Sequence, residues 1–404
     1  MTTGIAITAA EVISPAGRGI APLWRAMATG KTCVRQRDSL PWPNAVIDPG
    51  LLAWPRGGPW ADVEKYAGQA TRWALAAALP VIERAGRAEP SDATRCGTVI
   101  AVGWSPDELD DALPFLTESG RNGRGLPEVL YDEAPAFSSI RAIPSTTGFF
   151  VSMASGFQGS HVVLNGDAVV GGMGAVALAS RLIASDELDR VLVVGASTAS
   201  SAGLAARHRE EPFGSRARAG HGPFDVGRAG AFPGQAAAAL MIERASTAQE
   251  RDICPSAELL ACETFCARTR AAAAYAVIAS FEHQLAPDVW WAHGAGAPLT
   301  DSEECASFGL YAGMAPVTSS KGTIGLATEC SALVDLALAV EALHRRSMPP
   351  TALLDRIDPM LGAVDPVLRV PRNVAHTRTA LVTSLGPDPI AASAGAALLG
   401  RWEK

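Results

Sequence analysis

The sequence predicts an α/β protein in which helices cover mainly parallel or mixed sheets. Short runs rich in β-branched residues alternate along the chain with longer segments whose apolar residues recur at helical spacing. Two helical segments, one at 168–183 and one within 325–351, are apolar almost all round, which is typical of buried helices. Each lies near the middle of one half of the chain. We therefore expect two similar units, 1–245 and 246–404, with a polar seam that begins at residue 245.

Composition argues against several classes of function. The 404 residues are 48% hydrophobic and 19% charged, which is enough apolar material for a large core. A net charge of -7 and the absence of a lysine- or arginine-rich run argue against nucleic-acid binding. Apolar runs stop short of about 18 residues, the length that a membrane span needs. The N-terminus lacks the basic region of a signal peptide, and seven scattered cysteines without a C-x-x-C pair indicate a reduced, cytoplasmic protein.

The first half is expected to alternate strands and helices. Each expected strand is a short apolar run, and Gly or Pro marks several of the stops. Strands are expected at 4–14, 96–103, 161–166 and 190–197, and helices at 20–30, 66–86, 106–120, 146–159 and 168–183. The segment 220–243 is expected to form a turn, an apolar hairpin and a strand.

The second half is expected to repeat this alternation. Its strands are expected at 257–266, at the start of 289–298, at 315–320 and, as the last strand of the chain, at 377–386. Its helices are expected at 269–285, at 302–313 and within 325–351. The last of these carries Arg345 and Arg346 near its end, where cations favour the helix dipole.

The helix expected at 168–183 has the start of an active-site element without a reactive atom. Gly171, Gly172 and Gly174 would let another backbone approach closely. The free N–H groups at a helix start suit a thiolate or an oxyanion, but Ala168 and Val169 stand at this one. The glycines do not have the dinucleotide-binding spacing, and the sequence has no metal-ligand cluster, so no cofactor and no metal are expected.

Four stretches carry motifs that recur together in one family. They are "PFDVGRAGAFPGQ", "HGAGAPLTDSEE", "SSKGTIGL" and the stretch 165–183 itself. In this order they resemble the segments P-F-D-x-x-R-x-G, H-G-T-G-T-P-x-x-D-x-x-E, S-x-K-x-x-x-G-H and the A-C-x-x-G region of the β-ketoacyl synthases of the thiolase superfamily. The matching residues are Pro223, Phe224, Asp225, Arg228, Gly230 and Gly234, then His293, Gly294, Gly296, Pro298, Asp301 and Glu304, and then Ser319 or Ser320, Lys321 and Gly325.

The resemblance implies the thiolase fold, with two similar halves in five layers, α-β-α-β-α. In that family a cysteine at the start of a buried helix takes the acyl chain, two histidines promote decarboxylation and stabilise the enolate, and a lysine orders the site. His293 and Lys321 stand at two of these positions. Ala168 or Val169 stands at the cysteine position and Leu326 at the second histidine, so no intact catalytic set is expected. The family's C-terminal gate is replaced by "SLGPDP", and Gln235 stands where Glu is common.

Ketosynthase-like chains without the cysteine are known as chain-length factors. The resemblance therefore implies a non-catalytic subunit, inactive alone, that forms a heterodimer with an active ketosynthase of a type II polyketide or polyene system. Its other partners would be an acyl carrier protein and the growing chain. Four side chains are candidates for the chain tunnel or the subunit interface, with the ordinary core as the alternative: Phe137, Phe149, Phe150 and Met153.

Other interpretations stay open. His293 either holds a loop or acts as a base, and Lys321 either forms an ion pair or assists catalysis. Asp167 is a helix cap or a replacement acid, and Asp301 and Glu304 are expected to cap and order a helix start. The alternative functions are a divergent acyltransferase, decarboxylase or cyclase that uses His293, and a stand-alone protein that binds acyl chains or acyl carrier protein.

Overall fold

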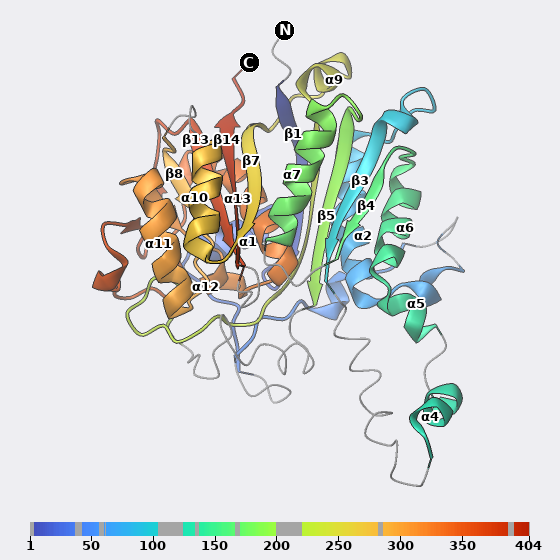
Figure 1. The fold of residues 1–404 in the computed structure, drawn as a ribbon, viewed down its shortest axis with the longest axis horizontal. Helices are drawn as coiled ribbons and strands as arrows, with labels where there is room; N and C mark the ends of the chain where they lie inside the picture. Colours follow the sequence, from blue (N-terminus) through green and yellow to red (C-terminus); the bar gives the residue numbers. More distant parts are fainter. Residues whose placement is uncertain are drawn as a thin grey trace.

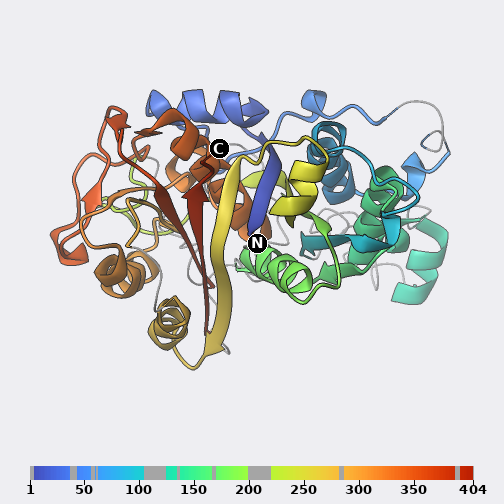
Figure 2. The same cartoon turned by 90° about the horizontal axis from the view of Figure 1, so that it is seen from above.

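The computed structural model describes residues 4–36, 43–55, 60, 62–103, 124–133, 137–165, 170–198, 220–281, 286–386 and 392–403. Within these residues the strands form a twelve-stranded sheet made of two half-sheets. The half-sheets meet where β1 (Ile5–Ser14) pairs with β7 (Ala257–Ala267) over two residue pairs, Ala6 with Glu258 and Ile7 with Ala257. Figure 2 shows β1 and β7 side by side in the middle, with one half of the chain on either side.

The two half-sheets have the same topology. In the described part of the N-terminal half, the spatial order is β1, β6, β5, β3, β4, and in the C-terminal half it is β7, β14, β13, β8, β9. Each is the order first, fifth, fourth, second, third along the chain. In both, the first two pairings are antiparallel and the last two are parallel. The remaining strands of these sets are β3 (Cys96–Val102), β4 (His161–Leu164), β5 (Arg190–Thr198), β6 (Gln235–Arg244), β8 (Val289–Trp291), β9 (Pro316–Thr318), β13 (Thr379–Leu385) and β14 (Ala392–Arg401).

Three layers of helices enclose the two half-sheets. The central layer is α7 (Gly171–Ala184) and α13 (Ser331–Arg345), which contact strands of both half-sheets. The outer layer of the N-terminal half is α2 (Gln69–Ala85) and α6 (Pro144–Ser155), and that of the C-terminal half is α10 (Arg270–Ser280) and α11 (Pro298–Ala312). Figure 1 shows α7 between these outer pairs. The predicted α/β fold in five layers, α-β-α-β-α, is confirmed.

Strand periodicity explains why there are five layers. Successive side chains of a strand point to opposite faces. On β5, Val191 and Val193 belong to the central core, whereas Leu192 and Val194 belong to the core under α2. β13 divides its side chains between the central core and the core under α10 in the same way. Strands covered on both faces need apolar residues at every position, which is why the sequence shows continuous apolar runs there.

The central helices also follow from their composition. α7 and α13 connect the third strand of their half-sheet to the fourth, so they occupy equivalent positions. Small residues let α7 approach its neighbours: a Cβ on Gly172 would lie 2.5 Å from the carbonyl oxygen of Glu329. α13 ends with Arg346 in the left-handed conformation, as a C-terminal cap.

Some expectations for the elements were wrong. Residues 220–234 do not form a hairpin, because their bridges go to distant segments, Asp225 to Ile357 and Pro233 to Leu326. The strand at Thr379–Leu385 is not the last, since β14 follows it and pairs with it. The expected seam contains a short helix, α9 (Ala245–Glu250). The helix expected at 106–120 lies outside the described residues.

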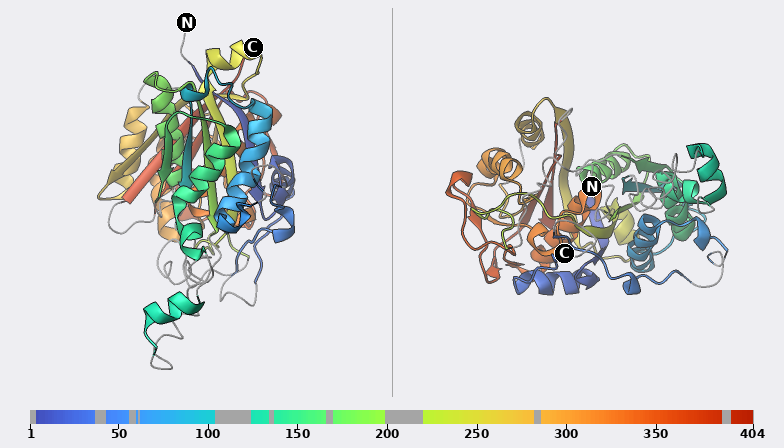
Figure 3. Two further views of the ribbon diagram at one scale, coloured as in Figure 1. Left: turned by 90° about the vertical axis from the view of Figure 1, so that its right-hand side faces the viewer. Right: turned by 90° about the horizontal axis from the view of Figure 1, so that it is seen from below.

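The remaining short helices and strands are additional to the strand sets and the helix pairs described above. Figure 3 shows α4 projecting from the body. The remaining helices are α1 (Ile20–Ala28), α4 (Leu126–Glu133), α5 (Ser138–Ala142) and α12 (Lys321–Ile324), with 3₁₀ turns η1 (Pro49–Leu51), η3 (Glu64–Tyr66), η4 (Ala93–Arg95), η5 (Thr328–Cys330) and η6 (Pro359–Leu361). The remaining strands are β2 (Gly17–Arg18), β10 (Ser347–Met348), β11 (Asp365–Pro366) and β12 (Arg372–Asn373).

Candidate functional site

The candidate site lies at the carboxyl ends of the parallel strands of the half-sheets. In open α/β sheets, ligands bind beyond the carboxyl ends of parallel strands, and β3, β4 and β5 are parallel. The chain leaves β4 at Leu164 and enters α7 at Gly171. The positions Asp167, Ala168 and Val169 lie between these two, outside the described residues. Neither Ala168 nor Val169 carries a nucleophilic atom.

His293 lies in the loop after β8 and is 1% exposed. Its backbone N–H donates to Oε1 of Glu304 over 2.7 Å, and the N–H of Gly294 donates to Oε2 over 2.8 Å. Its Nε2 has no hydrogen-bond partner among the described residues. Burial, with smaller contributions from Lys321 and Arg270, lowers the pKa of His293 well below its ordinary value. The imidazole is therefore neutral and offers one unoccupied nitrogen.

Two buried carboxylates hold the loop that carries His293. Burial raises the pKa of Glu304 to about 7, against hydrogen bonds from Thr383 and the loop that lower it. Asp301 accepts from the N–H groups of Gly296 (3.1 Å) and Phe224 (3.2 Å), and burial raises its pKa to about 6. The start of α11 has no side-chain cap. The expected capping role is therefore wrong, because both carboxylates bind N–H groups outside the helix.

Lys321 is committed to an ion pair. It lies in the first turn of α12, is 2% exposed, and its Nζ pairs with Oδ2 of Asp335 on α13. The hydroxyl of Ser320 donates to Oδ1 of the same carboxylate over 2.6 Å. Burial raises the pKa of Asp335, and the Lys321 ammonium opposes that shift. The pair joins the segment "SSKGTIGL" to α13, the central helix of the C-terminal half.

Leu326 makes its part of the site apolar. It is fully buried and packs in a small cluster with Ala231, Ala295 and Ala297. Two of these alanines belong to the loop that carries His293. Its side chain supplies no hydrogen-bond donor. The position at which the resemblance expects a second histidine therefore holds an apolar side chain.

Two further residues beside the site, Glu329 and Cys330, were not predicted from the sequence. Glu329 is 6% exposed and lies against the start of α7. Cys330 precedes α13, and its thiol lies 3.5 Å from the carbonyl oxygen of Gly195. Burial, reinforced by Glu329, raises the pKa of Cys330 well above its ordinary value, so the sulfur is a thiol and not a nucleophilic thiolate. The available signal was a charged residue between the small residues of "GLATECSAL".

The four aromatic and sulfur-containing candidates divide between core and surface. Phe150 is 1% exposed and meets Trp54 edge-to-face at 5.5 Å. Phe149 is 59% exposed. Phe137 is 38% exposed and contacts the ring of Tyr66, and Met153 is half-buried against the core under α2.

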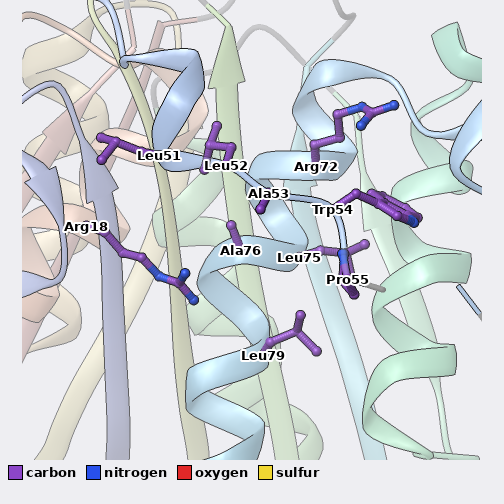
Figure 4. Close-up of a pocket in the computed structure, with 10 residues that line it drawn as sticks. All are labelled: Arg18, Leu51, Leu52, Ala53, Trp54, Pro55, Arg72, Leu75, Ala76 and Leu79. Atoms are coloured by element: carbon purple, nitrogen blue, oxygen red, sulfur yellow. The ribbon is translucent and has the colours of Figure 1, made fainter. Parts of the chain in front are cut away.

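Three cavities are lined by described residues outside the four motif segments. Figure 4 shows one of about 30 Å³ beside α2, which has room for about two water molecules. Two larger ones, of about 380 and 540 Å³, lie beside α1 and at the ends of β7 and β14. None of the three is lined by His293, Lys321 or Leu326. The described residues contain no cluster of side chains that could hold a metal ion, and no helix among them has the length and apolarity to cross a membrane.

Two family models match the chain. "Beta-ketoacyl synthase, N-terminal domain" matches residues 62–248, and "Beta-ketoacyl synthase, C-terminal domain" matches residues 266–355. A similar curated protein is the tetracenomycin polyketide synthase ketoacyl synthase beta subunit of Streptomyces glaucescens, which is 28% identical over 417 residues covering 95% of each chain.

Solved structures show the same fold. A β-ketoacyl synthase from Burkholderia phymatum superposes with a TM-score of 0.86 at 20% identity, over 100% of both chains. The ishigamide ketosynthase/chain length factor superposes with a TM-score of 0.82 at 20% identity, over 99% of this chain and 100% of the other.

Proposed function

We propose a function from one premise: this chain belongs to the β-ketoacyl synthase family, whose two domain models together match more than half of its residues. The function is that of a non-catalytic ketosynthase-like subunit, a chain-length factor. It pairs with an active β-ketoacyl synthase and shapes the space into which the acyl chain grows. Similarity over nearly the whole chain to a ketoacyl synthase beta subunit supports this choice within the family.

The observation that carries the proposal is the packing of Leu326. A position that needs an imidazole for condensation holds a fully buried leucine among three alanines. Lys321 is bound to Asp335, and the buried sulfur of Cys330 stays protonated. Nε2 of His293 has no hydrogen-bond partner among the residues that the structure describes. One donor without a nucleophile does not support condensation.

The edge of the N-terminal half-sheet supports the pairing. β4 is the last strand on its side of the described sheet, and edge strands offer unpaired N–H and C=O groups to another chain. Large apolar side chains are exposed on the elements around it, and such exposure marks interaction sites. They are Phe137, Ile140, Ile143 and Phe149, on or beside α5 and α6. In this proposal the surface receives the ketosynthase, and Phe149 and Phe137 lie at the interface or along the chain tunnel, with Phe150 and Met153 behind them.

Several finer points belong to the same proposal. The acyl carrier protein that delivers extender units is the third partner, as in the solved complex of a type II acyl carrier protein with its ketosynthase. A polyketide or polyene is the product class, and the cytoplasm is the compartment. The division into 1–245 and 246–404 is supported by strand β6, which ends at Arg244, and by the repeat of topology from β7 onward.

Co-expression with a candidate ketosynthase tests the pairing. Size-exclusion chromatography of the purified mixture should give a heterodimer, and product should form from malonyl-carrier protein only when the ketosynthase is present with its cysteine intact. A homodimeric or monomeric profile with every candidate ketosynthase would instead favour a stand-alone acyl-binding protein.

A second function is favoured by one observation: Nε2 of buried His293 has no hydrogen-bond partner among the described residues. A neutral imidazole has the lone pair that a general base needs, so a divergent acyltransferase, decarboxylase or cyclase is the rival. The variant H293A separates the two. Unchanged product output from the H293A complex supports the non-catalytic role, whereas a large loss of output, with the heterodimer intact, supports the rival.

A further inference from the structure

Glu329 places a carboxylate at the entrance of the central helix α7. It belongs to the 3₁₀ turn η5, between α12 and α13, and is 6% exposed. Its Cγ lies 3.7 Å from the position that a Cβ on Gly171 would take, and Gly171 is the first residue of α7. Burial of a carboxylate is costly without compensation. Its surroundings should therefore contain groups that favour it.

Hydroxyl groups supply part of this compensation. The Oγ1 hydroxyl of Thr328 donates to Oε2 of Glu329. The Oγ atom of Ser197, near the end of β5, lies 2.6 Å from Oγ1 of Thr328. The start of α7 also favours a negative charge through its dipole. The carboxylate is thus connected to the end of β5 through the hydroxyls of Thr328 and Ser197, and its side chain lies against the start of α7.

Two glycines make room for Glu329. A Cβ on Gly103, directly after β3, would overlap its Oε1, and a Cβ on Gly172 would lie 2.5 Å from its carbonyl oxygen. The Cβ position of Gly171 is in ordinary contact with its side chain. A side chain at 172 would therefore clash with the backbone of Glu329, and a side chain at 103 would require the Glu329 carboxylate to move. The carboxylate fills the space at the carboxyl ends of β3 and β5, where an α/β sheet receives its ligand.

We propose that Glu329 closes the acyl site of this subunit, by filling and charging the entrance of α7. The excluded ligand is an acyl thioester, because its chain is apolar and would have to displace or desolvate the carboxylate. The chain-length subunit would then leave the growing chain to its partner. The inference rests on the proposed non-catalytic function, and it assigns a specificity-determining role to a residue outside the degenerate catalytic positions.

Acyl binding to the isolated full-length chain tests this role. The probe is decanoyl-N-acetylcysteamine, a neutral thioester with a ten-carbon chain, titrated by isothermal calorimetry. E329S removes the bulk and the charge but keeps a hydroxyl beside Thr328. E329Q keeps the shape and removes only the charge. E83A, on the exposed side of α2, is the control for substitution of a glutamate elsewhere.

We expect E329S to bind the probe at least tenfold more tightly than wild type, E329Q to lie between them, and E83A to match wild type. Equal affinity of folded E329Q, E329S and wild type would overturn the proposal. If E329S fails to fold, E329Q alone decides, since loss of the charge must raise affinity. Size-exclusion chromatography with the ketosynthase is read separately, so a failed heterodimer would reject the proposed function without bearing on Glu329.

Discussion

The buried pair of Lys321 and Asp335 allows a quantitative test of the structural role of Lys321. The two side chains are 2% and 1% exposed, so solvent screens their interaction little. Replacement of Lys321 by Met removes the cation but leaves Asp335 buried, with one hydrogen bond from Ser320. The carboxyl then folds most favourably in its protonated form. Its folded pKa, already raised by burial, rises further when the opposing ammonium is gone.

The cost can be worked out from this protonation. To protonate a carboxyl whose ordinary pKa is 3.8 costs about 1.4 kcal/mol per pH unit above that value, which gives about 4 kcal/mol at pH 7 and about 2 kcal/mol at pH 5. The sign follows from the raised folded pKa: the stability is present below the unfolded pKa and is lost as pH rises. About 4 kcal/mol also agrees with the 3–5 kcal/mol typical of broken buried pairs.

Urea unfolding followed by circular dichroism at both pH values measures the free energy of unfolding. K321M should lose about 4 kcal/mol at pH 7 and about half of that at pH 5. The double variant K321M/D335N should recover most of the loss, because its buried amide carries no charge. A loss below about 1 kcal/mol at pH 7, or an equal loss at both pH values, would refute the reasoning.

Three further predictions follow from the same structure. In E304Q one acceptor oxygen becomes an NH₂ that faces an N–H of the loop at His293, so the free energy of unfolding should fall by about 2 kcal/mol at pH 5. Burial raises the pKa values of Glu304 and Asp301 to about 7 and about 6, so the free energy of unfolding of the wild type should decline as pH rises through this range. In urea titrations the free energy of unfolding of E304Q should decline less, and an equal decline would contradict this. L326H should bury an imidazole among alanines, lose about 2 kcal/mol or more in urea unfolding, and give no condensation product; full stability would contradict the packing. F149D should leave the isolated chain within about 0.5 kcal/mol of wild type but weaken its heterodimer at least tenfold in analytical ultracentrifugation, since Phe149 is 59% exposed; an unchanged affinity would remove Phe149 from the interface.

The elements whose patterns report local physics were predicted well. Continuous apolar runs identified strands such as Cys96–Val102 and Arg190–Thr198, because both faces of the half-sheets are covered. Small apolar residues identified the central helices for the same reason. The equivalence of the halves was visible as a repeated pattern, and the topology confirms it.

The segments whose secondary structure was not predicted correctly pair with residues that are distant in the sequence. Residues 220–234 contain turn residues and apolar residues, which is the pattern of a hairpin, yet their bridges go to Leu326 and Ile357. β14 has the composition of a helix, "ASAGAALLGR", and becomes a strand because it lies between β13 and β7. Tertiary pairing overrides propensity in both cases.

The candidate site also has a part that was predicted from the sequence and a part that was not. The sequence motifs predicted that His293, Lys321 and Leu326 belong to the site. The hydrogen bonds, ion pairs and packing of these residues depend on tertiary contacts that a sequence motif does not contain. The partner of Lys321 is fourteen residues away on another helix, and Glu304 binds backbone rather than capping its helix. Glu329 was not predicted as a site residue because the glycines that make room for it, Gly103 after β3 and Gly172 in α7, lie far from it in the sequence.

The central claim is that this chain carries no condensing chemistry of its own. The most direct test incubates the isolated chain with malonyl-carrier protein and an acyl primer, and measures β-ketoacyl product and released carbon dioxide by mass spectrometry. We expect no β-ketoacyl product above the protein-free control, and product once an active ketosynthase is added. Turnover to β-ketoacyl product by the isolated chain would contradict this expectation.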